Sequence, residues 1–443
     1  MIVDLLITVK STPEKTYYKA LQKLSPGHFL FHKNDDLIIK NYYIPTIKST
    51  PKIHTFEEAT ELMREKLRNA VKRRINNSSN VACELSGGID STAVCAISIE
   101  YNSAITGLSH AMNDATKLFF PYTDEKELIN DFLDYSHLKK HHFVAPVEEG
   151  ILDVIQESIS WMAYPQQFSY QWFSDILYKK AQLEGASTLL SGFGGDEGVS
   201  MHRSAMSEML LQNMNYIDFI QFEKIRSQTS SSKATIRLIK QLLKQFLEQQ
   251  FLYKKFQKQN FSLNNLSINL NELNQTEISN RYDQYKYGKK GYPDYTQYYC
   301  RVFQNHVSTR IDACSVMAGH YGIEYRYPLL DIDLLEFFFS LPICFKVSPT
   351  QTRYLYREAI KGYIPDSIRL RNDKSGATIP TVRYRLNKDF KLIESILQNV
   401  SGEKAYYVDG NKSIQSMNEI LSGASKVTHP SAFYSTLNYL LQP

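Results

Sequence analysis

Cysteine is scarce in this sequence of 443 residues, and the few cysteines are scattered. There are five, and no two of them form a C-x-x-C pair; they are Cys83, Cys95, Cys300, Cys314 and Cys344. The odd number and the wide spacing argue against a disulfide framework and against a zinc knuckle. We expect reduced thiols, as is usual for a cytoplasmic protein.

Long apolar runs and a strong charge of either sign are also missing. No stretch approaches the ~18 consecutive apolar residues of a membrane span. The N-terminus MIVDLLITVK is too short and too soon charged for a signal peptide. The net charge of +5 is small for this length and does not call for nucleic acid. We therefore expect a soluble, cytoplasmic protein with no membrane and no nucleic acid among its partners.

Strand-like and helix-like segments alternate between residue 80 and about residue 195. Apolar runs at residues 81–85, 103–108 and 186–190 are typical of buried strands, and residues 91–101 have the pattern of a helix. This order predicts an α/β fold with a doubly wound parallel sheet and helices on both faces. Ligands of such sheets bind beyond the carboxyl ends of the strands.

The segments on either side of this region differ from it. HFLFHKNDDLIIKNYY, residues 28–43, predicts a hairpin with its turn at residues 34–36. The N-terminal unit, residues 1–50, is too short to bury a core of its own. We expect it to pack against a main domain of residues 51–443. Residues 200–290 are rich in Gln, Asn, Lys and Ser. They predict a helical insertion that packs on the main domain or, alternatively, binds a peptide.

The stretch CELSGGIDSTAV, residues 83–94, combines an apolar run, a Gly-rich turn and the start of a helix. Gly87 and Gly88 leave the backbone N–H groups of the turn open, and the helix adds its positive N-terminal end, so a phosphate group fits there. No Walker A pattern occurs nearby. Asp90 would repel the phosphate unless a cation lay between them, and Mg²⁺ prefers such carboxylate and phosphate oxygens. We assign to this phosphate site Leu85, Ser86, Gly87, Gly88, Asp90 and Ser91.

The hexapeptide SGGIDS within that stretch resembles the pyrophosphate loop of the ATP-pyrophosphatase superfamily, which includes the asparagine, GMP and NAD synthetases. The resemblance implies an adenine nucleotide alpha hydrolase-like fold and cleavage of ATP between its α and β phosphates. LLSGFGGDE, residues 189–197, again follows an apolar run and resembles the second ATP loop of the asparagine synthetase family. This implies that Ser191 and Gly192 border the adenine and ribose, and that Asp196 joins Asp90 as a ligand of Mg²⁺.

Three further features resemble the same family. YGIEYRYPLLD, residues 321–331, matches a segment whose charged residues we expect to support the site through ion pairs. Arg353 stands where the family usually carries a lysine near ATP, and Lys374 falls on the family's catalytic lysine, so we assign both to catalysis. Leu108, at the end of a strand, is a candidate for the adenine pocket, with core packing as the alternative. The resemblance extends from about residue 55 to residue 390.

Two departures from the family pattern bear on the reaction. Residues 15–43 resemble the last strands of the family's glutamine-amidotransferase domain, but the first cysteine of this chain is Cys83. Because those domains use an N-terminal cysteine, we expect residues 1–50 to be a truncated remnant that does not hydrolyse glutamine. Phe193 stands where asparagine synthetases carry a glutamate, and its ring cannot transfer a proton. The pattern is most similar to the asparagine synthase-related branch, which includes the lasso-peptide macrolactam synthetases.

These features together predict an ATP- and Mg²⁺-dependent carbon–nitrogen ligase that adenylates a carboxylate, releases pyrophosphate and transfers the acyl group to an amine. The substrate would be a peptide or a small molecule, and a precursor peptide or a partner protein would be its macromolecular partner. Two alternatives stay open, a glutaminase-free asparagine synthetase that uses ammonia and a nucleotide-binding scaffold without catalysis. Asp90, Asp196 and Lys374 argue against the scaffold, and Phe193 argues against the use of ammonia.

Overall fold

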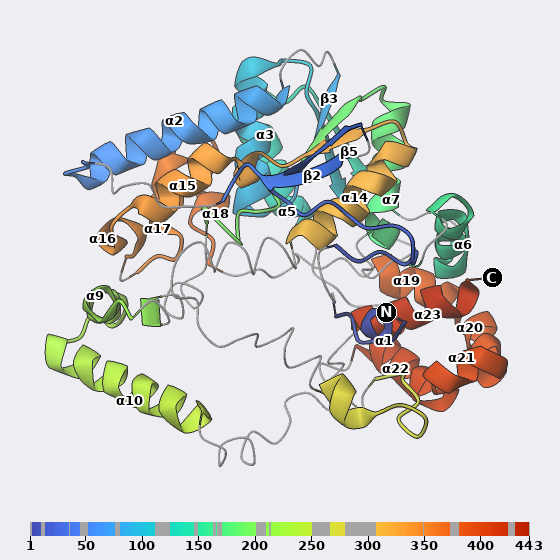
Figure 1. Ribbon diagram of the computed structural model, residues 1–443. Helices are drawn as coiled ribbons and strands as arrows, with labels where there is room; N and C mark the ends of the chain where they lie inside the picture. The colour runs from blue at the N-terminus through green and yellow to red at the C-terminus, as the bar shows by residue number, and fades with distance from the viewer. Residues whose placement is uncertain are drawn as a thin grey trace.

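The fold is seen in a computed structural model of the protein (Figure 1). The structure describes residues 2–9, 14–34, 36–44, 52–75, 80–110, 125–145, 149–162, 165, 171–200, 210–211, 214–249, 266–279, 307–348, 350–372, 381–423 and 430–442. Lys374, one of the residues assigned to catalysis, lies outside the described residues.

Five short parallel strands form the central sheet in the order β5-β4-β3-β6-β7. They are β3 (Val81–Glu84), β4 (Thr106–His110), β5 (Lys140–Val144), β6 (Thr188–Leu190) and β7 (Glu324–Arg326). The chain runs from β3 outward to β4 and β5, and then returns to place β6 on the other side of β3. The strand order therefore reverses between β3 and β6, and open α/β sheets bind their ligands at such a point.

The sheet is covered on both faces, which explains why its central strands are apolar without alternation. The first three residues of β3 and all three of β6 are buried, as expected for parallel strands between two layers of helices. Figure 1 shows α2 (Phe56–Ile75) and α3 (Ile89–Tyr101) packed together on one side, and α7 (Gln171–Leu183) and α14 (Ser308–His320) on the other. The predicted doubly wound α/β fold is confirmed.

Shorter elements complete the main hydrophobic core around the sheet. They are α5 (Lys126–Tyr135), the 3-10 helix η3 (Pro328–Leu330), α15 (Ile332–Ser340), α16 (Ile343–Lys346), α17 (Tyr354–Ala359) and α18 (Asp366–Arg369). Helices α15 and α17 both pack on α2, which also packs on α3 and so joins them to the sheet. None of the described helices is both long and apolar enough to cross a membrane.

A second hydrophobic core lies in the C-terminal helices, drawn in orange-red in Figure 1. It combines α6 (Ile151–Met162), α19 (Thr381–Lys388), α20 (Phe390–Gln398), α21 (Gly402–Tyr407), α22 (Gly410–Ser422) and α23 (Pro430–Leu441) with the N-terminal α1 (Ile2–Leu6). Residues 2–9 thus pack against C-terminal helices that are distant in the sequence. That residues 1–50 are the remnant of an amidotransferase domain stays a prediction.

The predicted hairpin is present as β1 (His28–Lys33) and β2 (Asp36–Asn41), which pair antiparallel. Within the predicted insertion, α9 (Tyr216–Ser227) packs on α16 and carries α10 (Ser231–Gln249). The buried carboxylate of Glu223 on α9 joins the two helices, because it pairs with Arg237 of α10 at 3.0 Å. It also pairs with Arg226 of its own helix at 2.9 Å. Most of the remaining insertion lies outside the described residues.

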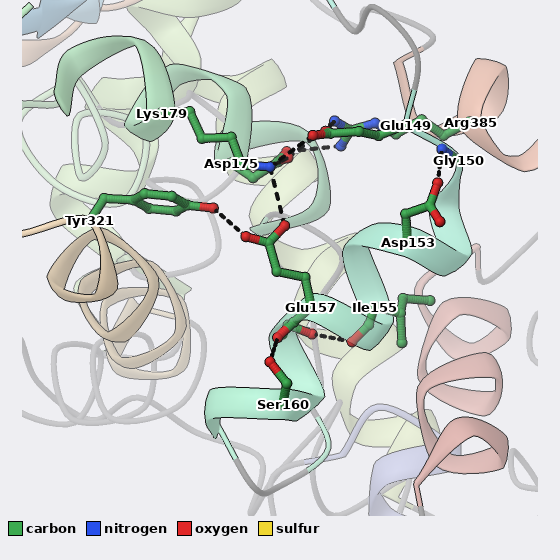
Figure 2. Close-up of polar contacts among 11 residues, drawn as sticks. Glu149, Gly150, Asp153, Ile155, Glu157, Ser160, Asp175, Lys179, Tyr321 and Arg385 are labelled. Carbon is green, nitrogen blue, oxygen red and sulfur yellow. Dashed lines mark hydrogen bonds and ion pairs between the residues drawn. The ribbon is translucent and has the colours of Figure 1, made fainter. Parts of the chain in front are cut away.

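A buried cluster of charges joins the two cores (Figure 2). The guanidinium of Arg385, on α19, is fully buried and lies 2.8 Å and 3.1 Å from the two carboxylate oxygens of Asp175 on α7. It also lies 3.1 Å from Glu149, and Lys179 bridges Glu149 and Glu157 at 3.0 Å and 3.1 Å. Burial raises the pKa of Asp175, although the positive charges of Arg385 and Lys179 act to lower it. The cluster therefore fixes α19 against the sheet domain.

Candidate functional site

Both Gly-rich loops emerge at the point where the strand order reverses. The first follows β3 and leads into α3, and the second follows β6, the neighbour of β3. A cavity of about 590 Å³ opens between them. Its lining contains these residues assigned from the sequence: Ser86, Gly87, Gly88, Asp90, Ser91, Ser191, Gly192, Asp196 and Arg353. Leu85 and Leu108 do not line it; both are buried in the core beneath the loops.

The glycines of the second loop allow it to lie directly on the start of α3. A Cβ atom on Gly192 would overlap the backbone of Ser91, and one on Gly195 would come within 2.5 Å of the carboxylate of Asp90. Either contact would have to move the loop, since real Cβ atoms do not approach so closely. The sequence pattern G-x-G-G-D-E thus follows from the close approach of the two loops.

The first loop already binds an anionic oxygen in this structure. The N–H of Gly87 donates to the carboxylate of Glu125 at 3.1 Å, and Arg371 pairs with the same carboxylate at 2.6 Å. The hydroxyls of Ser86 and Ser91 lie 2.7 Å apart across the turn. The N–H of Gly87 thus donates to a negatively charged oxygen, as expected for a phosphate site at a helix N-terminus.

Arg353 is the residue that brings the two predicted metal ligands together. Its guanidinium lies 2.9 Å from the carboxylate of Asp90 and also forms an ion pair with Asp196. The backbone of Arg353 has a φ of +57°, in the left-handed region that non-glycine residues rarely adopt and that occurs at functional sites. Burial lowers the pKa of Arg353, but the charges of Asp90 and Asp196 outweigh it, so this pKa is raised and the cation is permanent.

The arrangement fits a divalent cation. Asp90 and Asp196 converge on one positively charged group, so the guanidinium occupies a position where a cation is stabilised. No group of three or more carboxylate, histidine or cysteine side chains that could hold a metal occurs in the described parts of the chain. Mg²⁺ commonly binds through one or two carboxylates and completes its six ligands with water and phosphate oxygens. Two aspartates beside a phosphate site therefore suit it.

The sequence profile of the asparagine synthase family matches residues 62–436, which includes both Gly-rich loops and the sheet that carries them. The chain belongs to the asparagine synthase family. The match agrees with the α/β fold described above.

A relative gives the same family. A candidate glutamine-hydrolyzing asparagine synthetase of Methanocaldococcus jannaschii is 28% identical to the chain over 181 residues. The aligned part is 41% of this chain and 34% of that protein. The similarity therefore covers only part of the relative.

Four arginines line the cavity beside five carboxylates, and among these arginines the analysis of the sequence singled out only Arg353. Arg357 donates to the backbone carbonyls of Thr352 at 2.8 Å and Arg371 at 2.7 Å, and burial together with Arg353 lowers its pKa to about 10. Arg371 pairs with Glu125, as described, and Arg310 reaches the cavity from α14. Arg357 lies one helical turn after Arg353, which is a signal that the sequence offered. Arg310 carries no such signal, because only the fold brings α14 to the loops.

Phe193 forms an apolar and aromatic part of the cavity wall. Its ring lies 4.0 Å below the guanidinium carbon of Arg310 and makes an edge contact with Tyr327 at 6.0 Å. Ser191 donates its hydroxyl proton to Glu84 at 2.7 Å. At position 193 the cavity wall therefore consists of the Phe193 ring with the Arg310 guanidinium over it, and the Phe193 side chain cannot transfer a proton.

The segment YGIEYRYPLLD forms ion pairs, as predicted, but outside this cavity. Asp331 accepts from Arg73 at 3.3 Å and from Arg74 at 2.7 Å, and it caps α15 through the N–H of Leu334. Glu324 pairs with Arg326 at 2.5 Å. Asp331 thus ties α2 to the start of α15. Arg326 of β7, the strand next to β6, also donates to the backbone carbonyl of Arg74 at 2.5 Å and so ties β7 to α2. The segment thus supports the second loop through β7, which pairs with the strand that leads into the loop.

Proposed function

We propose that this protein is an ATP-dependent ligase that activates a carboxylate as an acyl-adenylate and transfers the acyl group to an amine. The observation that carries the proposal is the convergence of Asp90 and Asp196 on one cation position between two Gly-rich loops. Membership in the asparagine synthase family supports it. The finer assignments, AMP and pyrophosphate as products and a peptide as substrate, are part of the proposal.

In the first step an oxygen of the substrate carboxylate attacks the α-phosphorus of ATP. The bond from this phosphorus to the bridging oxygen breaks, and pyrophosphate leaves with the electron pair. The turn at Gly87 and Gly88 and the N-terminus of α3 bind the departing phosphates. Asp90 and Asp196 would hold the Mg²⁺ ion, whose charge would offset that of the phosphates. Arg353 lines the same cavity as Gly87 and Gly88, so we expect its guanidinium to pair with the phosphates once a metal ion replaces it between the carboxylates.

In the second step the nitrogen of the amine attacks the acyl carbon and AMP leaves with the electrons of the acyl–oxygen bond. Negative charge develops first on the α-phosphate oxygens and later on the tetrahedral oxygen. An ammonium group at Lys374 would stabilise both, and removal of one such preorganised group typically costs ~10²–10³ in rate. The proton of the amine has no acceptor at Phe193, so we assign its removal to the departing phosphate or to solvent.

The nature of residue 193 favours a peptide or small-molecule amine over ammonia. The ring of Phe193 is covered by the guanidinium of Arg310, and it cannot accept a proton, unlike the glutamate that asparagine synthetases carry at this position. When carboxylate and amine belong to one precursor peptide, the product is a macrolactam, and this is the form we favour. The second candidate is an asparagine-type synthetase, which the similarity to the relative from Methanocaldococcus jannaschii favours.

The exchange of labelled pyrophosphate into ATP tests the proposal and separates the candidates. Exchange that depends on Mg²⁺ and on a peptide or small-molecule carboxylate, and that Asp90→Asn and Asp196→Asn abolish, would support acyl-adenylate formation. Exchange that depends on aspartate, with asparagine formed from ammonia, would support the second candidate. Absence of exchange with every carboxylate tried, with ATP still bound, would overturn both in favour of a binding scaffold.

A further inference from the structure

The hairpin of β1 and β2 exposes apolar side chains on both of its faces. Neighbouring residues in a strand point to opposite faces, so a run of apolar residues such as FLF or LII cannot be covered from one side. Between 41% and 69% of each of these large side chains is exposed: Phe29, Leu30, Phe31, Leu37, Ile38, Ile39, Tyr42 and Ile44. A lone two-stranded hairpin is marginally stable in water, and a contiguous apolar patch of this kind marks an interaction surface.

Polar contacts at its two ends hold the hairpin on the outside of the sheet domain. Before β1, Lys23 pairs with Asp312 of α14 at 2.7 Å. After β2, the hydroxyl of Tyr43 donates to Glu336 of α15 at 2.9 Å. Figure 1 shows the hairpin in dark blue, and no residue of it lines the cavity described above. Its position is therefore defined, and it is separate from the candidate ATP site.

Among the residues that the structure describes, β2 pairs only with β1, so its other edge is open. The hydrogen-bond pattern of the hairpin shows which backbone groups of β2 face this open edge. The two-residue turn has Asn34 at a φ of +49°, and Lys33 lies opposite Asp36. The N–H of Tyr42 donates to the carbonyl of Gly27 at 2.8 Å. Because bonded and non-bonded pairs alternate in an antiparallel ladder, Asp36, Ile38 and Lys40 bond toward β1. The backbone groups of Leu37 and Ile39 then point outward.

The sequence of β2 is complementary to itself in the antiparallel direction. DLIIK, residues 36–40, can pair with a second copy about Ile38. Asp36 then lies opposite the partner's Lys40, and Leu37 lies opposite the partner's Ile39. The open edge allows this register, because the outward groups of Leu37 and Ile39 form four hydrogen bonds with the same groups of the partner. Opposite charges face each other twice, and like charges never do.

We propose that the protein forms a homodimer through the open edge of β2, which joins two hairpins into a four-stranded antiparallel sheet. Such an interface is isologous, since the same surface is used by both copies. It is also small, on the order of 1,000 Å² in total, which is typical of reversible association. We therefore expect a dissociation constant of roughly 1–100 µM, measurable by analytical ultracentrifugation.

Cysteine cross-linking tests the register. Two copies of Ile38 form a non-bonded pair with Cα atoms about 4.5 Å apart, within the range of a disulfide. Two copies of Ile39 lie roughly 8 Å apart along and across the strands, which is too far. With Cys300 and Cys344 changed to serine, we expect Ile38→Cys to give a covalent dimer under mild oxidation and Ile39→Cys, the matched control, to stay monomeric. Equal cross-linking of both variants would overturn the proposed register.

A charge exchange tests the pairing without cysteine. Asp36→Lys alone and Lys40→Asp alone each place like charges opposite each other twice, so we expect at least a tenfold weaker dimer. The double variant, Asp36→Lys with Lys40→Asp, restores opposite charges and should dimerise like the original protein. Circular dichroism and ATP binding confirm that each variant is folded. A protein that stays monomeric at ~100 µM, or single variants that dimerise as well as the double variant, would contradict the proposal.

Discussion

Replacement of Arg353 by glutamine is the change whose consequences follow most directly from the geometry. The variant leaves the carboxylates of Asp90 and Asp196 facing each other with no positive charge between them. In the present structure the side chains of Arg353, Asp90 and Asp196 are 7%, 17% and 42% exposed. Loss of one partner from a buried pair costs about 3–5 kcal/mol, and the exposure of Asp196 reduces its share toward that of a surface pair. We therefore expect Arg353→Gln to lower the free energy of unfolding by roughly 2–4 kcal/mol.

Mg²⁺ without nucleotide should restore most of this loss in the variant. A cation that binds only the folded state at 100 times its dissociation constant contributes about 2.7 kcal/mol. In the original protein the guanidinium competes for the same carboxylates, so we expect Mg²⁺ alone to have little effect. Urea unfolding with 0 and ~10 mM Mg²⁺ measures both effects. The control is Arg371→Gln, which removes an equally buried ion pair with Glu125 in the same cavity and should not respond to Mg²⁺. An equal response of both variants would refute the assignment of Asp90 and Asp196 as a cation site.

Three further predictions follow from other parts of the structure. Gly195→Ala should abolish pyrophosphate exchange without unfolding the protein, because the added Cβ would displace Asp90. Gly319→Ala, the control, has open space around it and should be neutral or slightly stabilising. Equal exchange activity of the two variants would contradict this prediction. Arg385→Met should lower the free energy of unfolding in urea by about 3–5 kcal/mol, because Asp175 would stay buried without its partner. Lys179→Met, at a more exposed position, should lower it by ~1 kcal/mol or less. Similar losses in the two variants would show that the cluster does not behave as a buried one. Burial lowers the pKa values of His110 and His141 to about 4, so the unfolded state takes up protons first and stability should fall as the pH drops from about 6.5 toward 4. The double variant His110→Gln and His141→Gln should show a smaller fall in urea midpoint between pH 7.5 and pH 5, and an unchanged fall would contradict the assignment.

The features that could be predicted from the sequence are those with a local cause. The turn at Gly87 and Gly88 follows an apolar strand and starts a helix, so strand, turn and helix can all be recognised within a dozen residues. The same holds for the loop that ends in Asp196. That the two loops meet follows from the alternation of strands and helices, which allows only a parallel sheet with its carboxyl ends at one edge.

The features that could not be predicted depend on segments that are distant in the sequence. Arg310 and Glu125 reach the cavity only because α14 and the segment before α5 pack beside the loops. Strand β5, with the polar sequence KHHFV at the edge of the sheet, and β7, with only three residues, lack the apolar run that identified the other strands. The ion pairs of Arg353 with two aspartates about 157 and 263 residues away in the chain likewise have no local signal.

A structure of the protein with Mg²⁺ and an ATP analogue that cannot be cleaved between the α and β phosphates tests the central claim most directly. We predict a metal ion between Asp90 and Asp196, the terminal phosphates on the turn at Gly87 and Gly88, and the guanidinium of Arg353 moved onto the phosphates. A bound nucleotide that leaves Arg353 paired with both aspartates, and no metal between them, would contradict the account.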